Sequence, residues 1–438
     1  MQLSPIEHWI ARKLRTTEPL PVSCLQKYQV RKVRETLEYV LSNSRFYKRH
    51  LGGYDPDSIQ GIEDIARLPL TQPEELAASP NDFLCVPPRD ISRIVSLPTS
   101  GTTGRSKRIA FTPEDQELII DFFHYGMATL VNPSDRVMIF LPGKTEGSVG
   151  DLLIKALFRL GCEGTVFGPI ADYGHALKTL LDIKPTSVVG IPSQLLALSR
   201  HAESGFSAGQ VQLKSVLLST DYVSRAVVDS LTGTWRCKVF GHYGMTEMGL
   251  GGGVECAARD GYHMRDADLL FEIIDPVTKE PVADGEYGEV VFSTLTRVGM
   301  PLVRYRTGDR SRFLKQPCLC GSVLKRMERI SGRVKEPVRL FDGSFISIAQ
   351  LDEILFGNPC VCGYAAEICL KSGCDCLVLT IQPARAGIDS ERIAAKLCND
   401  LSIGPLIAQK QLKLEIRESA VDYFTTGTAK RLIADKRG

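Results

Sequence analysis

The sequence predicts an α/β protein with parallel-rich sheets covered by helices, an antiparallel β subdomain and a small α+β C-terminal domain. Three observations support this prediction. Apolar strand-like segments alternate with amphipathic helical segments from about residue 90 onward, strands joined by turns follow Gly253, and the residues after Gly332 mix short strands and helices. The 438 residues are too many for one compact core, so we expect more than one domain, with a boundary near Gly332.

The N-terminal segment is predicted to be helical. In "LQKYQVRKVRETLEYVLSNSRFYKRHL", apolar residues recur at helical spacing and would form one face: Leu25, Tyr28, Val30, Val33, Leu37 and Leu41. Further along, predicted strands lie in "DRVMIFLPG", "GCEGTVFGP", "TSVVGIPS" and "LKSVLLSTD". Helices are predicted between them, in "VGDLLIKALFRLGCEG", which Gly161 would end, in "ADYGHALKTLLDIKP" and in "QLLALSRHAES". This alternation predicts a parallel sheet, with ligand loops at the carboxyl ends of its strands.

The antiparallel subdomain is predicted from "LLFEIIDPVTKEPVADGEYGEVVFSTL". Its apolar strands are separated by turn residues at Asp275-Pro276 and Asp284-Gly285. We therefore expect these strands to pair as hairpins.

Composition excludes several classes of protein. Hydrophobic residues make up 43% and charged residues 24%, an ordinary globular composition, and the formal charge of +2 gives no reason to expect nucleic acid or an anionic membrane as a partner. No apolar run is long enough to span a bilayer, and "MQLSPIEHWIARKLR" carries charges where a signal peptide has its apolar core. We therefore expect a cytoplasmic protein. The 13 irregularly spaced cysteines predict reduced thiols, some of them binding metal, rather than disulfides.

The stretch "SLPTSGTTGRSKRIAFT" combines hydroxyl side chains, glycines and a lysine. Glycines let backbone N–H groups approach a ligand closely, hydroxyls add donors and Lys107 adds a charge, so the stretch suits a polyphosphate. The spacing is not that of a Walker A loop. By composition alone, a flexible surface loop is an equally good interpretation.

The motif T-S-G-T-T-G-x-x-K resembles the phosphate loop of the adenylate-forming superfamily, which includes acyl-CoA synthetases and luciferases. Similar elements follow in the family's order: "HYGMTEMG" at 242–249, "YRTGD" at 305–309, the hinge-like "ISGRVKE" at 330–336 and "TTGTAKRLIADKR" near the end. "RFYKRHL", "VECAARDGYH", "TLTRVGMPLVRYRTGD" and "PCLCG" are similar to the phenylacetate-CoA ligase-like branch, which also contains coenzyme F390 synthetases.

The resemblance implies an N-terminal adenylate-forming domain over 1–334 and a mobile C-terminal domain over 335–438. It also implies a reaction in which a carboxylic acid attacks the α-phosphate of ATP, pyrophosphate leaves, and CoA captures the acyl group from acyl-AMP. The expected partners are therefore ATP, Mg²⁺, CoA and an aryl or similar acid, and relatives suggest a monomer or homodimer. Two alternatives stay open: an adenylyltransferase of the coenzyme F390 synthetase type, and a nucleotide-binding scaffold with a degenerate site.

Site residues carried over from the resemblance fall into three groups. The β- and γ-phosphates would be held by Thr99, Ser100, Gly101, Thr102, Thr103, Gly104 and Lys107. Thr246 would bond the α-phosphate, and Glu247 would hold Mg²⁺, which prefers carboxylate and phosphate oxygens. Tyr243 and Gly244 would contact the adenine, Asp309 would bond the ribose hydroxyls, and Arg333 would bond the ribose or phosphate. The nucleotide would be bordered by Ser219, Thr220 and Asp221, and Lys335 would lie at the hinge.

The C-terminal motif departs from the family pattern. The family's adenylation lysine stands in G-K-x-x-R, and Thr428 occupies its place here. A hydroxyl cannot supply that positive charge, and losing one preorganised charge typically costs on the order of a hundredfold in rate. Lys430 would share Thr428's face on an extended segment and could take over, or adenylation could be impaired.

The cysteines form two groups. Cys256, His263, Cys318 and Cys320 offer a Cys₃His ligand set, and similar elements form a structural zinc site in phenylacetate-CoA ligase-like proteins. Unconnected residues are the alternative. The second group lies in "CVCGYAAEICLKSGCDCLVL", with Cys398 beyond it, and is interpreted as core thiols in preference to a metal or iron–sulfur site.

The acid is expected near 122–130, 140–148 and 190–194. Phe123, His124 and Tyr125 could line an aryl pocket or form a helix face packed in the core, and His242 would border the site.

Overall fold

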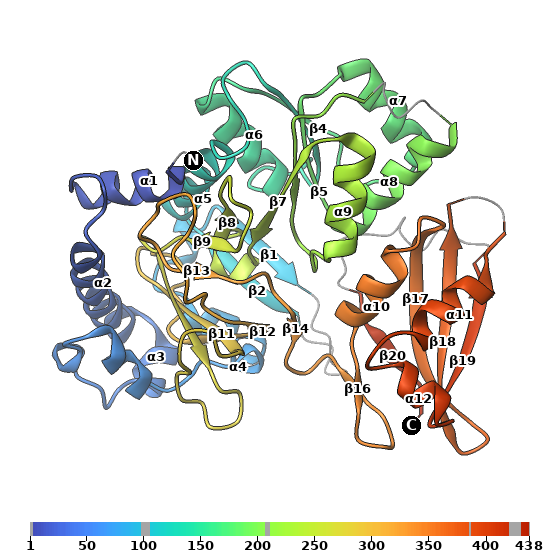
Figure 1. Cartoon of the computed structure of the whole chain (residues 1–438). Coiled ribbons are helices and arrows are strands. Elements are labelled where there is room, and N and C mark those ends of the chain that lie inside the picture. The colour runs from blue at the N-terminus through green and yellow to red at the C-terminus, as the bar shows by residue number, and fades with distance from the viewer. Residues whose placement is uncertain (1–2, 98–105, 206–210, 385–386, 420–430, 438) are drawn as a thin grey trace. The chain divides into compact units, whose positions relative to one another are not determined.

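The computed structural model describes residues 3–97, 106–205, 211–384, 387–419 and 431–437 (Figure 1). The chain forms two compact units. The first comprises Met1–Ser134, Thr145–Cys162 and Phe240–Arg329, and the second Asp135–Lys144, Glu163–Val239 and Ile330–Gly438. Both units combine helices with sheets, which confirms the predicted α/β class. The division into 1–334 and 335–438 stays a prediction. None of the helices in the described part of the chain combines the length and apolar character that crossing a membrane requires.

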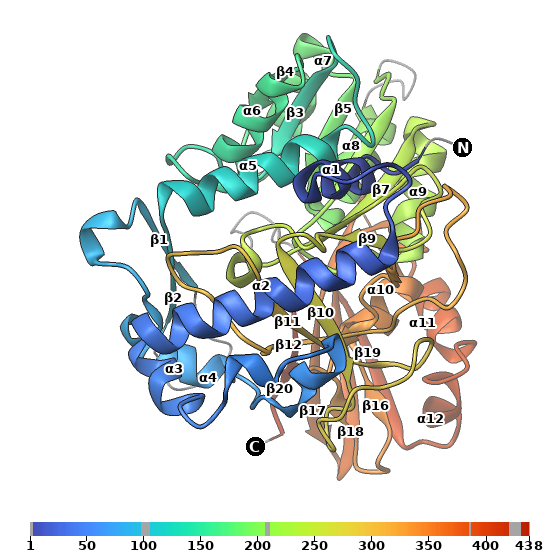
Figure 2. The ribbon, with the colours of Figure 1, turned by 90° about the vertical axis from the view of Figure 1, so that its left-hand side faces the viewer.

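Helices of the first unit surround its sheets. They are α1 (Pro5–Leu14), α2 (Val22–Asn43), α3 (Arg45–His50), α4 (Pro73–Ala78), α5 (Pro113–Met127) and α6 (Val149–Arg159). In Figure 2 the long helix α2 runs past the antiparallel strands. Its buried face differs from the predicted one: Tyr28, Val30 and Leu41 are only partly buried. Gln29 and Thr36 are buried instead, and each side chain bonds a backbone carbonyl, of Asp266 and Leu295 respectively.

Three antiparallel arrangements form the sheets of the first unit. Strands β1 (Arg93–Leu97) and β2 (Lys107–Phe111) pair with each other on either side of the undescribed stretch 98–105. Strands β10 (Leu269–Ile274), β11 (Gly288–Thr294) and β12 (Tyr305–Ser311) are neighbours. The predicted turn residues at Asp275-Pro276 and Asp284-Gly285 lie in the connection of β10 and β11, which pair as a hairpin. A further group has the order β13 (Arg326–Met327), β9 (Tyr262–Met264), β8 (Gly253–Glu255) and β7 (Lys238–Tyr243).

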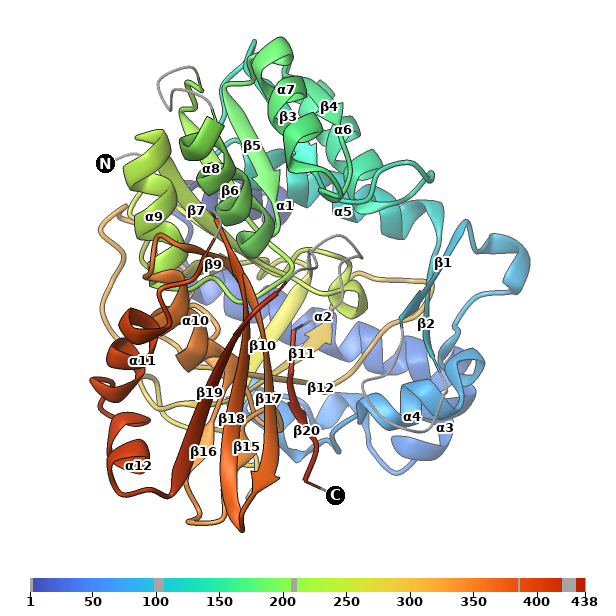
Figure 3. The ribbon, with the colours of Figure 1, turned by 90° about the vertical axis from the view of Figure 1, so that its right-hand side faces the viewer.

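The second unit contains the predicted parallel sheet. Its strands lie in the order β6 (Ser215–Leu218), β5 (Ser187–Gly190), β3 (Arg136–Phe140) and β4 (Glu163–Val166), all parallel. Helices α7 (Tyr173–Ile183), α8 (Pro192–Gly205) and α9 (Arg225–Trp235) accompany them, and α7 and α8 lie beside these strands in Figure 3. Buried side chains such as Phe140, Leu177 and Leu196 belong to one apolar core.

The C-terminal part of the second unit is an α+β layer. Its sheet has the order β19 (Leu412–Glu418), β18 (Cys374–Pro383), β17 (Val361–Lys371) and β20 (Ile433–Asp435). The remaining elements are α10 (Ile348–Phe356), α11 (Ser390–Cys398), α12 (Gly404–Ala408), β14 (Gly332–Arg333) and the hairpin β15 (Val338–Arg339) with β16 (Phe345–Ile346). Glu353 of α10 accepts hydrogen bonds from the backbone N–H groups of Arg225 and Ala226, at the start of α9. Because a carboxylate there bonds free N–H groups and faces the positive end of the helix dipole, it stabilises α9.

The start of α5 is held by a reciprocal cap. The Asp115 N–H donates to the Thr112 hydroxyl and the Thr112 N–H donates to the Asp115 carboxylate, both at 3.1 Å. The same carboxylate accepts from the N–H groups of Val298 and Gly299, at 2.9 and 3.0 Å. Asp115 therefore connects the first turn of α5 to the loop before β12.

We predict that Asp115→Ala lowers the free energy of unfolding by about 2–3 kcal/mol, because three buried N–H groups lose their acceptor. Glu114→Ala, one residue earlier on the same turn, is expected to change it by less than about 0.5 kcal/mol. Urea unfolding followed by circular dichroism measures both values. Equal effects of the two substitutions would contradict this account.

Candidate active site

An ion pair between a buried carboxylate and a partly buried ammonium joins two of the predicted nucleotide elements. The Lys107 ammonium donates to the Glu247 carboxylate, and Glu247 is only 2% exposed. The Tyr305 hydroxyl lies 3.3 Å from Lys107 Nζ and donates to Glu247 Oε1 at 3.3 Å. A carboxylate, an ammonium and a phenol from three distant parts of the sequence thus meet at one point of the first unit.

Local structure explains how these side chains converge. Lys107 is the first residue of β2, directly beyond the glycine- and hydroxyl-rich stretch. Glu247 lies in a single 3₁₀ turn, Thr246–Met248, which follows β7. Gly244 allows the chain to turn there, because a Cβ at this position would lie 2.0 Å from the Leu250 carbonyl oxygen.

Strand β12 places a second pair of predicted residues together. Its burial alternates, so Tyr305, Thr307 and Asp309 share the buried face. The Tyr243 hydroxyl donates to Asp309 Oδ2 at 3.0 Å, which orients the carboxylate predicted to bond the ribose. Because Tyr305 contacts Glu247 and Asp309 lies on the same strand face, one strand connects the two pairs.

The electrostatics of the cluster suit a charged ligand. Burial, and then the neighbouring Glu247 carboxylate, raises the pKa of Tyr305 well above its ordinary value, so the phenol stays protonated and donates. Lys107 and Glu247 neutralise each other in this arrangement. A polyphosphate with a divalent cation would supply an anion to the ammonium and a cation to the carboxylate.

Other predicted residues lie elsewhere. Thr99, Ser100, Gly101, Thr102, Thr103 and Gly104, with Thr428 and Lys430, lie outside the described residues. Ser219, Thr220, Asp221, Arg333 and Lys335 belong to the second unit, so their roles toward a nucleotide stay predictions. Thr220, directly after β6, has a φ of 77°, a left-handed backbone that non-glycine residues adopt mainly at functional sites and turns.

Within the second unit, Arg431 holds the end of the C-terminal motif. Its guanidinium bonds both oxygens of Asp352 at 2.7 Å and Asp221 Oδ2 at 3.1 Å. The Tyr364 hydroxyl donates to Asp352 at 2.6 Å. The residue that directly follows Lys430 is therefore anchored to Asp221, in the predicted nucleotide-bordering loop after β6.

Helix α5 separates the three predicted pocket residues. The Phe123 ring lies 6.3 Å from the ring of His242, and Phe122, which the sequence analysis did not select, lies 6.4 Å from it. Tyr125 faces α1 instead, where its hydroxyl accepts from Arg12 at 2.9 Å. Tyr125 is therefore interpreted as a packing residue, and Phe123 keeps the contact expected of a pocket residue.

The predicted Cys₃His set comes together in the first unit. The ligand atoms of Cys256, His263, Cys318 and Cys320 all lie within 4.8 Å of one another, and the four residues are buried. The Sγ atoms of Cys256 and Cys318 are 3.5 Å apart, and Cys320 Sγ is 3.4 Å from His263 Nε2. A tetrahedral zinc ion with bonds of about 2.0–2.3 Å has ligand separations close to these values.

The second cysteine group behaves differently. Within the described ranges, the Cys256 set is the one group of three or more metal-ligating side chains that meets this spacing. Cys362 and Cys376 are buried, whereas Cys360 and Cys398 are exposed. The interpretation as core thiols therefore fits only part of the group, because Cys360 precedes β17 and Cys398 ends the surface helix α11.

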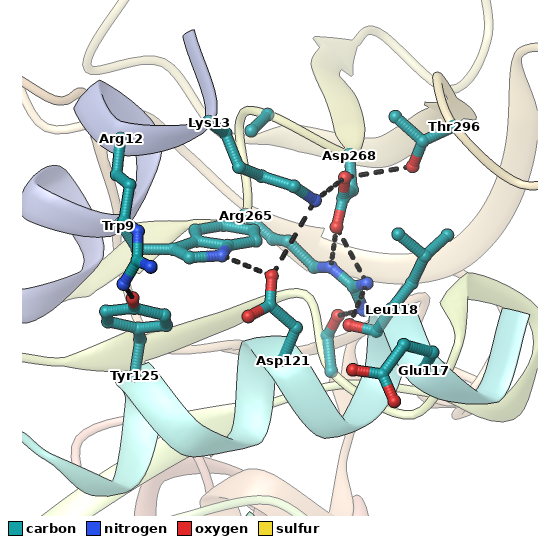
Figure 4. Close-up of polar contacts among 12 residues, drawn as sticks. Trp9, Arg12, Lys13, Glu117, Leu118, Asp121, Tyr125, Arg265, Asp268 and Thr296 are labelled. Carbon is teal, nitrogen blue, oxygen red and sulfur yellow. Dashed lines mark hydrogen bonds and ion pairs between the residues drawn. The ribbon is translucent and has the colours of Figure 1, made fainter. Parts of the chain in front are cut away.

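A polar network attaches α1 to α5 and to the turn at residues 265–268, between β9 and β10 (Figure 4). Lys13 Nζ lies 2.6 Å from Asp268 Oδ1, and Arg265 Nε donates to Asp268 Oδ2 at 2.9 Å. Trp9 Nε1 donates to Asp121 of α5 at 2.7 Å. Burial alone would raise the pKa of Asp268, but Arg265 and Lys13 lower it below its ordinary value. The buried carboxylate is therefore charged and fully engaged.

The sequence analysis missed two residues of the site, Tyr305 and Arg297. Tyr305 could have been found from the strand period, since it stands four residues before Asp309 on the same face. Arg297 lies in "TLTRVGMPLVRYRTGD" and donates to the Glu247 carbonyl at 2.7 Å. No local signal identified it, because its contact is long-range.

His242 provides a pH-dependent prediction. Burial lowers its pKa from 6.5 to about 4, so between these values the unfolded chain binds the proton more strongly than the folded chain. We expect this contribution to be complete above about pH 6.5 and to be lost toward pH 4, by on the order of 2–3 kcal/mol. His242→Asn should flatten the pH dependence of the unfolding free energy over this window. Parallel curves for the two proteins would contradict the prediction.

Comparison with known proteins agrees with the geometry. The curated relatives include phenylacetate-coenzyme A ligases from Aromatoleum evansii, with 27% identity over 94% of both chains, and from Escherichia coli, with 28% identity over 78% of both. The fold is similar to that of a 2-hydroxyisobutyryl-CoA ligase bound to its acyl adenylate, at a TM-score of 0.82 and 21% identity over 95% of this chain and 91% of that one. It is also similar to the anthranilate CoA ligase AuaEII, at a TM-score of 0.54 and 16% identity over 77% of this chain and 66% of that one.

The family model described as AMP-binding enzyme matches residues 56–296. This range contains the glycine-rich stretch, Lys107, Tyr243 and Glu247, which the resemblance had identified. The chain belongs to the AMP-binding enzyme family, and within it resembles the phenylacetate-CoA ligase branch.

Proposed function

We propose that the protein is an AMP-forming acid–CoA ligase that activates an aryl or similar carboxylic acid. In the first step a carboxylate oxygen attacks the α-phosphorus of ATP, the bond to the bridging oxygen breaks and pyrophosphate leaves. In the second step the CoA thiol, losing its proton, attacks the acyl carbon, and AMP leaves with the electron pair of the broken acyl–oxygen bond. The products are acyl-CoA, AMP and pyrophosphate.

One observation carries the proposal: Lys107, Glu247 and Tyr305 meet in the first unit. Tyr305 lies on β12, the strand that also bears Asp309. In our assignment, Lys107 with residues 99–104 holds the β- and γ-phosphates, Thr246 bonds the α-phosphate, and Asp309 bonds the ribose. Phosphoryl transfer depends mainly on positioning and on neutralising phosphate charge, which these groups supply.

Glu247 is the residue that we propose to hold Mg²⁺. Its carboxylate oxygen chemistry fits a hard cation, and when bound the ion would neutralise phosphate charge. Hydrogen bonds from Tyr305 and Lys107 to Oε1 hold the Glu247 carboxylate in one orientation. We assign the charge that Thr428 lacks to Lys430, with Arg333 and Lys335 contributing at the nucleotide and hinge.

We propose that Cys256, His263, Cys318 and Cys320 bind a structural zinc ion. Three thiols and one imidazole at these separations suit Zn²⁺, and four protein ligands leave no open position for catalysis. The N–H groups of Ala258 and Cys320 donate to the Cys256 and Cys318 sulfurs, at 3.4 and 3.5 Å, and would orient them as thiolate ligands. We also propose a cytoplasmic location, because the 13 cysteines are not paired as disulfides.

ATP–pyrophosphate exchange with a panel of aryl and small aliphatic acids tests the function. Acid-dependent exchange, followed by acyl-CoA formation with CoA, is the expected result. Exchange without any acid would favour the adenylyltransferase, and nucleotide binding without exchange would favour the scaffold. A Lys430→Ala variant with an unchanged exchange rate would exclude the role assigned to Lys430.

Glu247→Gln is expected to lower the exchange rate by about 100-fold or more, because the variant loses the charge proposed to hold Mg²⁺. Glu272→Gln is the matched control, a buried glutamate that pairs with Arg304 instead. It should lower the melting temperature and leave exchange within a few-fold of the wild-type rate. Similar exchange losses in the two variants would contradict the role of Glu247.

Metal analysis of protein purified without chelator should find about one zinc per chain. Cys318→Ser is expected to lose most of this zinc and to melt at a lower temperature. Cys360→Ser, which changes an exposed cysteine outside the set, should keep it. The zinc assignment fails if Cys318→Ser and the wild-type protein hold equal amounts of metal.

A further inference from the structure

Arg297 is a buried arginine whose role the proposed chemistry does not use. It is 8% exposed, and it donates to two backbone carbonyls, of Glu247 at 2.7 Å and of Ala110 at 2.9 Å. Its guanidinium also lies over the Phe111 ring, 4.5 Å from the centroid. These contacts fix a planar, forked cation between two backbone segments.

The two segments are the ones that carry the central ion pair. Ala110 and Phe111 end β2, whose first residue is Lys107. Glu247 is itself the other partner, and Arg297 holds its backbone while Lys107 and Tyr305 hold its carboxylate. A single side chain therefore sets the spacing between the backbones that present the ammonium and the carboxylate.

The charge of Arg297 is compensated differently from that of two other buried arginines. Arg265 pairs with Asp268 and Arg304 pairs with Glu272. In the part of the chain that the structure describes, the recorded hydrogen bonds of Arg297 go to carbonyl oxygens. The Asp115 carboxylate attracts it at longer range but accepts three backbone N–H groups.

Burying a guanidinium without a bonded carboxylate is costly. Burial accordingly lowers the pKa of Arg297, although the group remains a cation at neutral pH. With Lys107, Glu247 and Asp115, it forms a group of two cations and two carboxylates, so the charges around the pair balance.

We propose that Arg297 is a positioning residue for the nucleotide: it locks Glu247 and strand β2 in register and so holds the Lys107–Glu247 site in the arrangement that binds Mg·ATP. This proposal rests on the proposed function, because it names the same site. Its role is indirect, since Arg297 acts through the backbone of Glu247 and of Ala110.

Three variants test the proposal. Arg297→Met removes the charge and both hydrogen bonds while keeping much of the volume. Arg297→Lys keeps the charge but cannot reach both carbonyls with a planar fork. Arg304→Lys is the matched control, because Arg304 is 2% exposed and also bonds two carbonyls, of Ala66 and Leu68. For each protein, melting temperature, Mg·ATP affinity by calorimetry and the kinetic constants for exchange are measured well below the melting transition.

We expect Arg297→Met to weaken Mg·ATP binding and raise the KM for ATP by about 10-fold or more, and Arg297→Lys to lie between it and the wild-type protein. Arg304→Lys should lower the melting temperature yet keep Mg·ATP affinity within about 3-fold of wild type. The proposal is overturned if both Arg297 variants bind Mg·ATP as the wild-type protein does, or if Arg304→Lys loses as much affinity as Arg297→Lys.

Measuring both Mg·ATP binding and exchange distinguishes a failure of the Arg297 proposal from a failure of the ligase proposal. If the wild-type protein binds Mg·ATP but shows no acid-dependent exchange, the ligase assignment fails while the affinity comparison still tests Arg297. If the wild-type protein does not bind Mg·ATP at all, both proposals fail, because there is no nucleotide site for Arg297 to position.

Discussion

The ion pair of buried Glu247 with partly buried Lys107 is the constraint on which the site depends. Two charges removed from water cost more than their attraction returns unless further polar groups satisfy them. Tyr305 supplies such a group by donating to the carboxylate, and its raised pKa keeps the proton in place. The short turn after β7 and the start of β2 must therefore keep their spacing, and any displacement of either would leave a buried charge without its partner.

Another buried carboxylate of the first unit is satisfied in the same way. Arg265 and Lys13 share Asp268, and their network joins α1 to the turn at residues 265–268, between β9 and β10 (Figure 4). The Asp115 carboxylate accepts from the N–H groups of Thr112, which caps α5, and of Val298, in the loop before β12. These contacts give the first unit a polar interior in which the described acidic side chains are held by specific donors, which is how buried polar groups are tolerated.

The second unit organises the C-terminal motif in a comparable way. Arg431 lies between Asp352 and Asp221, and Glu353 of the neighbouring helix α10 caps α9. Apolar side chains of the parallel strands, of helices α7 to α9 and of the C-terminal α+β layer belong to one core. Arg431, which directly follows Lys430 in the sequence, is therefore tied to the loop after β6.

Fold class and most helices and strands could be predicted from the sequence, because periodicity and turn residues act over a few positions. The four parallel strands and the hairpin of β10 and β11, whose connection contains the turns at Asp275 and Asp284, are examples. The buried face of α2 was predicted only in part: Gln29 and Thr36 are buried because carbonyls from residues far along the chain receive their hydrogen bonds.

By itself, the sequence determined the motifs, their order and the Cys₃His set, since each depends on residue type and spacing. Only the tertiary structure decided that Lys107 meets Glu247, that Tyr305 joins them, that Tyr125 faces α1, and that Arg297 holds both backbones. The physical reason is that these contacts join residues far apart in the chain. Their distances follow from how strands and helices pack, and no local pattern encodes that packing.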